Sequence, residues 1–402
     1  MERAGAETVI RNNTVTEAPR NSSPLQEDSH PKIETPPGQD SRRARSYETT
    51  KLWTGIAQTI LFFAFVALIV ATGVTVTAEQ WVRTVFSNDY LVLLGFALLV
   101  GASEGILTFP LNWYAGYYLE HRYQLSNQTM RAWLWEGLKG RLVGLVIGVP
   151  LLLGFFFALR SYGELWWVPV GILLFVVSVV LARLGPVLIF PLFYTFRPLP
   201  EGEVQEKIMA LCRTAGVAVS GIFTFDMSKN TKKANAAFTG IGKSKRIILG
   251  DTLLEQFTED EIEAVFAHEL GHYTMNHVWI MMGVGTASTF LGLFLTSLAY
   301  EASIGWFGFG GIDTIAALPL LGLWLGVYSL VTSPLNNMLS RFHEFAADRY
   351  AVRTTGNGNA LADALKKLAQ MNLADLAPNP VVEFLFHSHP SIERRLKAIG
   401  AR

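Results

Sequence analysis

The stretch FAHELGHYTMNH, residues 266–277, joins a metal-ligand pattern to the beginning of an apolar segment. His268 and His272 are four residues apart, so they share one face of a helix and can offer two imidazole nitrogens to one zinc ion. Glu269 is placed to take a proton from a water that the metal activates. An uncharged run begins at Val278. The stretch predicts a metal site at the edge of a membrane, and the alternative is a polar helix end without metal.

The composition of the chain is typical of a membrane protein. Half of the 402 residues are hydrophobic and 16% are charged, whereas soluble domains have about 25% charged residues. The 33 basic and 33 acidic residues cancel, so no net charge favours nucleic acid as a partner. The single cysteine, Cys212, excludes an intrachain disulfide and a cysteine-based zinc site. Histidines and carboxylates must therefore hold any metal.

Six apolar runs, of which the second is interrupted by Glu104 and the fourth by Arg183, are long enough to cross a hydrocarbon layer of ~30 Å. They cover residues 52–78, 90–118, 142–159, 165–196, 278–300 and 314–332. Prolines in the second and fourth runs allow a bend there, which leaves a seventh crossing open. These runs predict an α-helical polytopic membrane protein.

The order of polar and apolar segments predicts five parts. These are a disordered polar tail over 1–50, four transmembrane helices over 51–196, an α/β region with the metal-binding helix over 197–277, two transmembrane helices over 278–332, and a second ligand helix with a tail over 333–402. In the α/β region, residues 222–225, 234–238 and 246–250 have the pattern of strands. Either Thr252 or Thr258 can cap the helix that carries the histidines.

Basic residues in the short connections predict the orientation, because lysine and arginine are retained on the cytoplasmic side of a membrane. Four such residues stand just before the first run, at positions 42, 43, 45 and 51, and four lie within residues 120–141. The three connections on the other side hold few basic residues: Arg83 in the first, Arg160 in the second and none in the third. With six spans, we expect the N-terminus, the metal site and the C-terminus to face the cytoplasm.

A third protein ligand is needed, because catalytic zinc takes three and keeps one position open. The stretch SRFHEFAADRYA, residues 340–351, places Glu344 and Asp348 on one face of a second helix. We expect Glu344 to bind zinc and Asp348 to accept a hydrogen bond from the imidazole of His268, which would fix its tautomer. The alternative is a solvated acidic face.

Three polar residues near these patterns are assigned by helical geometry alone. Asn276 is four residues beyond His272 and stays on the ligand face, so we expect it to support the ligands from behind. His277 is five residues beyond His272 and is expected to point away from that face. His343 is adjacent to Glu344 and is likewise expected to point elsewhere.

Four ordered motifs resemble the integral-membrane zinc metallopeptidases of peptidase family M48, most closely the type I CAAX prenyl protease branch. They are NAAFTGIGKSKRIILGDTLL, HELGHYTMNH, SRFHEFAAD and SHPSIERRLKAI. The resemblance implies a gluzincin-like α/β protease domain on the cytoplasmic side and membrane helices that enclose an intramembrane chamber. It also implies one zinc ion per chain, held by His268, His272 and Glu344, with Glu269 as the general base.

The resemblance suggests further site residues. His389, in SHPSIERR, matches a position near the scissile bond where an imidazole can stabilise the oxyanion. Arg395 matches an arginine that could bind the substrate carboxylate or backbone. Asn235 and Ala236 lie on an expected edge strand, to which an extended substrate can add. A purely structural role is the alternative for each of them.

The predicted function is that of an integral-membrane zinc endopeptidase, which hydrolyses peptide bonds of peptides or proteins. The predicted substrates include C-terminally prenylated ones. Membrane lipid is an expected partner, and nucleic acid is not. One alternative is a quality-control metalloprotease of the HtpX type. Another is a transporter or scaffold with structural zinc, but such a site has no use for Glu269 beside the ligands.

Overall fold

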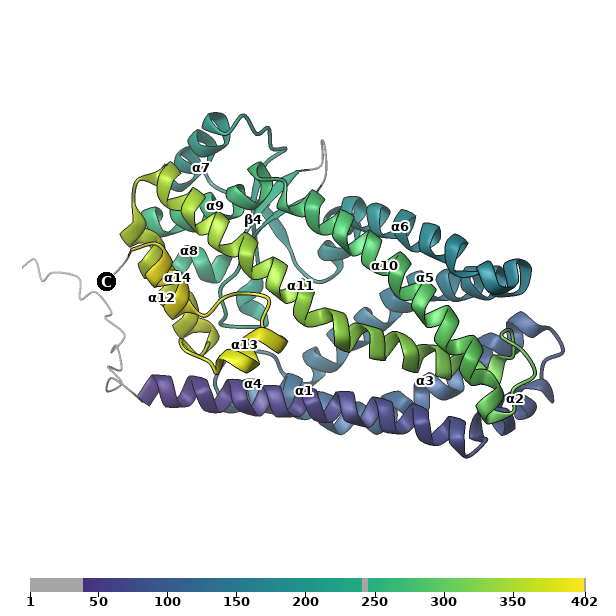
Figure 1. Cartoon of the computed structure of the whole chain (residues 1–402). Helices are drawn as coiled ribbons and strands as arrows, with labels where there is room; N and C mark the ends of the chain where they lie inside the picture. Colours follow the sequence, from purple (N-terminus) through teal and green to yellow (C-terminus); the bar gives the residue numbers. More distant parts are fainter. Residues whose placement is uncertain (1–38, 241–244, 401–402) are drawn as a thin grey trace, which may run out of the picture. The chain divides into compact units, whose positions relative to one another are not determined.

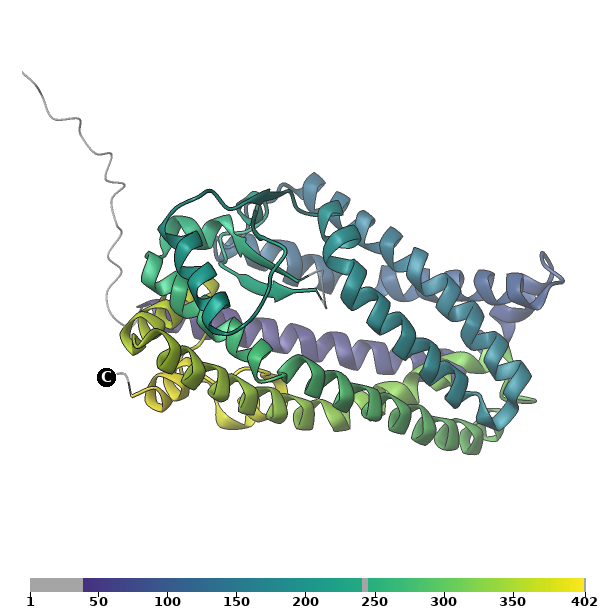
Figure 2. The same cartoon turned by 90° about the horizontal axis from the view of Figure 1, so that it is seen from above.

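The computed structural model describes residues 39–240 and 245–400 (Figures 1 and 2). Long helices lie side by side, and a small α/β part lies at one end of them. Residues 1–38 of the expected polar tail lie outside the described residues. Residues 39–50 form the first turns of helix α1 (Gln39–Ala71), because Ala44 and Tyr47 are buried against the rest of the protein.

Six helical segments are long and apolar enough to cross a membrane. They are Ser41–Ala71, Asp89–Arg122, Met130–Leu165, Trp167–Leu192, His277–Phe307 and Ile315–Thr355. In the most apolar window of each segment at most 28% of the residues are buried, so most of its apolar side chains are at least partly accessible. Such a surface suits contact with lipid rather than with water.

The regular elements of this part are α1, α2 (Val74–Arg83), α3 (Asp89–Trp113), α4 (Leu119–Arg122), α5 (Met130–Tyr162), α6 (Trp167–Leu184), α10 (His277–Ile304) and α11 (Leu318–Thr355). The uncharged run over 52–78 does not form one helix. It is divided between α1 and α2 at Gly73, whose φ of 71° is a conformation that glycine adopts without steric cost.

The α/β part contains a four-stranded sheet of order β1-β2-β4-β3. The strands are β1 (Phe196–Pro198), β2 (Ile222–Phe225), β3 (Ala236–Thr239) and β4 (Arg246–Gly250). β2 and β4 are parallel, and the two outer pairs are antiparallel. Strand β3 lies at one edge, since among the described residues it pairs only with β4.

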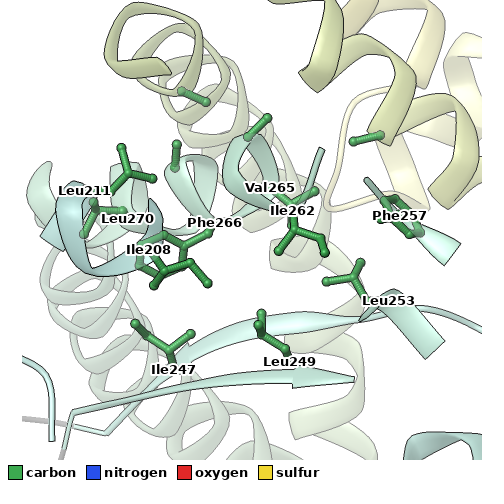
Figure 3. Close-up of a cluster of buried hydrophobic side chains, with 14 of the residues drawn as sticks. Ile208, Leu211, Ile247, Leu249, Leu253, Phe257, Ile262, Val265, Phe266 and Leu270 are labelled. Atoms are coloured by element: carbon green, nitrogen blue, oxygen red, sulfur yellow. The ribbon is translucent and has the colours of Figure 1, made fainter. Parts of the chain in front are cut away.

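Helix α9 (Glu259–Thr274) packs on this sheet through an apolar stripe (Figure 3). Ile262, Phe266 and Leu270 recur every four residues and are buried, and the first two face Ile247 and Leu249 of β4. Each such side chain contributes about 1.5–3 kcal/mol on full burial. Because this stripe faces the sheet, the opposite face of α9, which carries the two motif histidines, is turned away from it.

Helix α9 begins with a capping box and is followed by a turn with a positive φ. At the beginning, Thr258 rather than Thr252 is the cap: Thr258 Oγ1 accepts from the Glu261 N–H at 3.3 Å, and Glu261 Oε2 accepts from the Thr258 N–H at 2.7 Å. At the far end, Asn276 has a φ of 57°, so the chain turns before α10 begins at His277.

Helices α9 and α11 are in close contact at Gly271. A Cβ atom built on Gly271 would lie 3.2 Å from the Cα of Ala347 and 3.1 Å from a ring carbon of Tyr350. Ala347 is fully buried. The small residues therefore let the two helices approach closely enough for side chains of α11 to reach the histidines of α9.

The C-terminal part consists of α12 (Gly358–Asn372), α13 (Pro380–Phe386) and α14 (Ile392–Ala398). Helices α7 (Glu203–Thr214), α8 (Asp251–Gln256) and α12 share the hydrophobic core with α9 and the sheet. The metal-ligand helix is thus held by the sheet on one side and by α11 on another.

Candidate metal centre

Three side chains from two helices bring potential metal-binding atoms together. His268 and His272 of α9 and Glu344 of α11 each offer one such atom, all within 4.8 Å of one another. The two Nε2 atoms are 3.2 Å apart, and the Glu344 carboxylate oxygens lie 3.4 Å from His268 Nε2 and 3.3 Å from His272 Nε2. Two imidazoles and one carboxylate are a donor set of catalytic zinc.

The chemistry of this cluster fits a cation. The Oε2 atom of Glu344 is buried, and His268 Nε2 and Arg395 Nη1 each lie 3.4 Å from it. A buried carboxylate oxygen with only such long contacts is costly, and a metal ion between the three side chains would satisfy it. Burial lowers the pKa of His268, but hydrogen bonds to Asp348 and Glu344 outweigh this effect and raise the pKa to about 9. The same two carboxylates favour a cation in the cluster.

Asp348 lies behind His268, as the sequence predicts. Its Oδ1 atom is 2.9 Å from His268 Nδ1, and its side chain is fully buried. This contact fits a proton on Nδ1, which leaves Nε2 free to face the cluster.

Arg395 lines a cavity beside the cluster, and the expectation that it binds substrate stays a prediction. Its guanidinium is buried and donates to both oxygens of Asp348, at 2.9 Å from Nε and 2.6 Å from Nη2. Burial lowers its pKa, but the pair with Asp348 outweighs this and raises it. The guanidinium is thus already paired with a carboxylate, and it supports the one that holds His268.

Glu269 lies between two cavities. The membrane-side cavity has about 740 Å³ and is lined by Glu269, His272 and side chains of α6, α10 and α11. The domain-side cavity has about 400 Å³ and is lined by Glu269, His268, Glu344 and apolar side chains of α12. Burial raises the pKa of the Glu269 carboxyl, and the neighbouring histidines oppose this effect. A peptide that runs from one cavity to the other must pass this carboxylate.

The structure corrects the assignment of the residues that follow His272. The Nδ1 atom of His277 lies 3.1 Å from Nδ1 of His272, and the ring of His343 stacks on that of His277 at 4.0 Å between centroids. Both histidines were expected to point elsewhere. Asn276 was expected to support the ligands, but its side chain is exposed. The reason is the turn at Asn276, which starts a new helix and brings His277 back toward the cluster.

The remaining predicted residues lie around the domain-side cavity. Asn235, Ala236 and His389 line it together with Glu269. His389 is 65% exposed, and its Nε2 atom lies 3.4 Å from Oε1 of Glu344. Ala236 begins the edge strand β3, and the Asn235 carbonyl accepts from the Gly250 N–H at 2.9 Å. The roles expected for these three residues stay predictions.

These features define a class: a helical membrane protein that brings two histidines and two glutamates together between cavities, as metallopeptidases do. The chain belongs to peptidase family M48, which residues 198–402 match. Residues 34–195 match a second family, described as the CAAX prenyl protease N-terminal region with five membrane helices.

Similar proteins cover most of the chain. An uncharacterized metalloprotease, YhfN, of Bacillus subtilis is 31% identical over 84% of this chain and 79% of its own length. CAAX prenyl protease 1 of Saccharomyces cerevisiae is 31% identical over 76% of this chain and 71% of its own length. The crystal structure of Ste24p from S. mikatae superimposes with a TM-score of 0.81, at 27% identity, over 90% of this chain and 89% of that one.

The comparisons confirm the predicted family, fold class and type of activity. The protein is an integral multi-pass membrane metallopeptidase, with a zincin-like α/β domain at one end of its membrane helices. The membrane-side cavity lies between those helices and the domain, where the chamber was expected.

Proposed function

We propose that this metallopeptidase is a zinc-dependent endopeptidase that cleaves extended peptides close to a mobile C-terminus and accepts prenylated ones among them. One observation carries the proposal: Glu269 lines both cavities next to His268, His272 and Glu344. A peptide bond held between the cavities would lie beside the base and the metal ligands together. The match of residues 34–195 to the CAAX prenyl protease N-terminal family favours this function over membrane-protein quality control.

The side chains of the cluster divide the chemistry among them. His268, His272 and Glu344 would hold zinc, which when bound polarises the peptide carbonyl and makes a water more acidic. Glu269 takes the proton of the attacking water and then delivers it to the leaving amine. His389, exposed beside Glu344, donates a hydrogen bond to the oxygen that becomes negative in the transition state.

The edge strand β3 would bind the peptide backbone. Its outer edge can add an extended substrate as a further strand, with Asn235 and Ala236 at the end nearest to Glu269 in the domain-side cavity. Backbone hydrogen bonds of this kind depend little on the substrate's sequence. They would also exclude a folded domain, because only an extended chain can pair along a strand.

Lys245 is the candidate for binding a terminal carboxylate. It is the one lysine or arginine among the described residues that line the membrane-side cavity, and its ammonium lies on the ring of Tyr273 at 4.4 Å from the centroid. Arg395 is less suitable, since Asp348 already occupies its guanidinium. Burial of a prenyl chain against the apolar side chains of the same cavity would contribute about 0.8 kcal/mol of binding free energy per CH₂ group.

The expected orientation gives the substrate a route. Lysine and arginine residues near the domain-side ends of α1 and α5 favour the cytoplasmic side for that end. The N-terminus, the metal centre and the C-terminus would then face the cytoplasm, and membrane lipid would surround the helices. Cytoplasmic peptides could reach the edge strand without crossing the bilayer.

The test measures kcat/KM for one reporter peptide with and without a farnesyl group, and with its C-terminus free or amidated. A zinc chelator should abolish turnover of all forms. We expect removal of either feature to lower kcat/KM by less than ~100-fold, or about 2.7 kcal/mol of transition-state binding. A larger loss would contradict the broader specificity and indicate a dedicated prenyl protease.

The same assay tests whether Lys245 binds the terminal carboxylate. In Lys245→Gln, the penalty for amidating the peptide should disappear, because the charge that distinguishes the two termini has been removed. Lys232→Gln removes an exposed lysine outside both cavities and should keep the penalty. If amidation costs the same in all three proteins, Lys245 does not bind the carboxylate.

A further inference from the structure

Exposed apolar side chains form a patch on α13 and the neighbouring part of α11. It consists of Val381, Phe384, Leu335, Met338 and Phe342, which are 64%, 45%, 56%, 53% and 65% exposed. Phe384, Met338 and Phe342 line one depression, so the surfaces of the two helices are joined, and the charged residues Arg341, Glu383 and Arg394 line it as well. Exposed apolar surface of this kind indicates a partner.

Hydrogen bonds fix the position of α13 along α11. Asn337 Nδ2 donates to the Leu385 carbonyl at 3.0 Å, and Arg341 Nη1 donates to the Glu383 carbonyl at 3.0 Å. The arginine is buried, so these bonds hold α13 firmly at the level of residues 337–341.

That level coincides with the expected edge of the hydrocarbon layer. Helix α11 begins at Leu318, and about 20 residues at 1.5 Å each span the ~30 Å of hydrocarbon. Counting from Leu318, the layer ends near Asn337. Residues 337–341, and α13 with them, therefore lie where the acyl chains give way to the headgroups.

Exposed tryptophans on α10 support this position for the membrane. Trp279 and Trp306 are 51% and 71% exposed, near the beginning of α10 and just past its end, and Trp279 also lines the membrane-side cavity. Their separation of 27 residues corresponds to about 40 Å of helix, which matches a bilayer with its headgroup regions. Tryptophan prefers these two levels. Trp135 is also exposed, near the beginning of α5.

We infer that α13 is an interfacial helix, which lies in the headgroup region of a phospholipid bilayer with Val381 and Phe384 among the upper acyl chains. The patch continues the lipid-facing surface of a membrane helix and lies at its boundary level. A bilayer therefore covers the patch without any further protein.

This position bears on the candidate site. The loop that follows α13 carries His389, whose Nε2 atom lies 3.4 Å from Glu344. Lipid contact on α13 holds the beginning of this loop. The consequence for catalysis rests on the proposed role of His389, whereas the membrane position of α13 does not.

The test places a nitroxide label on α13 in the full chain, reconstituted into phosphatidylcholine vesicles. Labels at Val381→Cys and Phe384→Cys should collide more often with oxygen, which concentrates in the bilayer, than with a water-soluble nickel chelate. Lys397→Cys on α14 is the matched control, because this side chain is 72% exposed and pairs only at the surface. Equal nickel accessibility at 381, 384 and 397 would overturn the inference.

A second measurement needs no substitution. A photoactivated apolar carbene reagent dissolved in the vesicles should label peptides that contain α13 and α10 but not those that contain α14. Absence of the label from α13, with α10 labelled in the same sample, would also overturn the inference. If α13 is labelled but Val381→Ser with Phe384→Ser leaves turnover unchanged, the interfacial position stands and the link to His389 is refuted.

Discussion

His277 lies behind His272 with 3.1 Å between their Nδ1 atoms, although the two residues belong to different helices. Asp348 occupies the corresponding place behind His268, at 2.9 Å. Each of the two candidate ligand histidines therefore has a partner at Nδ1 that turns its Nε2 atom toward Glu344. One partner is a carboxylate and the other is an imidazole, so the two histidines are held by groups of different charge.

Replacing His277 should weaken zinc binding. His277→Ala removes the partner of His272, and changes of this kind typically cost ~10–100-fold in metal affinity. Asn276→Gly is the matched control, because glycine adopts the positive φ of this position and the side chain of Asn276 is exposed. A competition titration with a chromophoric chelator measures both. Weaker binding in Asn276→Gly than in His277→Ala would contradict the assignment.

Glu269→Gln should separate binding from catalysis. The amide leaves all three candidate ligands in place but cannot accept a proton, so zinc content should be unchanged while turnover falls by ~10²–10⁴-fold. Metal content and peptide hydrolysis are measured on one preparation. Full activity in the zinc-loaded variant would show that another group is the base.

Changes at Glu344 and Asp348 should differ in size. Glu344→Ala removes a candidate ligand, and zinc binding should be lost. Asp348→Asn leaves the ligands but removes the carboxylate that His268 and Arg395 share, so a loss of ~10–100-fold is expected. Zinc titration distinguishes the two. Binding by Glu344→Ala as tight as in the parent would mean that the third ligand lies elsewhere.

Cys212 should resist alkylation in the native protein. Burial raises the pKa of its thiol to about 11, and the side chain is almost fully buried. At pH 8.5 the thiolate fraction would then be more than ~100-fold below that of an unfolded cysteine. Iodoacetamide labelling before and after denaturation measures this ratio. Rapid labelling of the native chain would show that the α7 region opens readily.

Patterns within single helices were predictable from the sequence. The spacing of His268 and His272 fixes their common face, and the spacing of Glu344 and Asp348 does the same on α11. The apolar stripe of α9 and the capping pair of Thr258 and Glu261 are equally local. These features depend only on helical geometry, which the sequence determines without knowledge of the neighbours.

The features that the sequence did not predict depend on breaks and on distant partners. His277 was placed by continuing the period of α9, but Asn276 ends that helix and begins a new direction. An asparagine at this point is a known helix-ending signal, so this error was avoidable. The pairing of Arg395 with Asp348 could not be predicted in this way, because the two residues are 47 positions apart and meet only when α14 packs against α11.

Helix α11 carries Glu344 at one end of a membrane-crossing rod, whereas His268 and His272 lie on a helix outside the membrane segments. From Leu318 to Glu344 the rod is about 39 Å long, so a tilt of about one degree about its far end moves the carboxylate by about 0.7 Å. Bilayer thickness influences helix tilt. A bilayer that tilts α11 relative to α9 would therefore change the free energy of metal binding, and we expect the same chain to bind zinc with different affinity in thin and thick membranes.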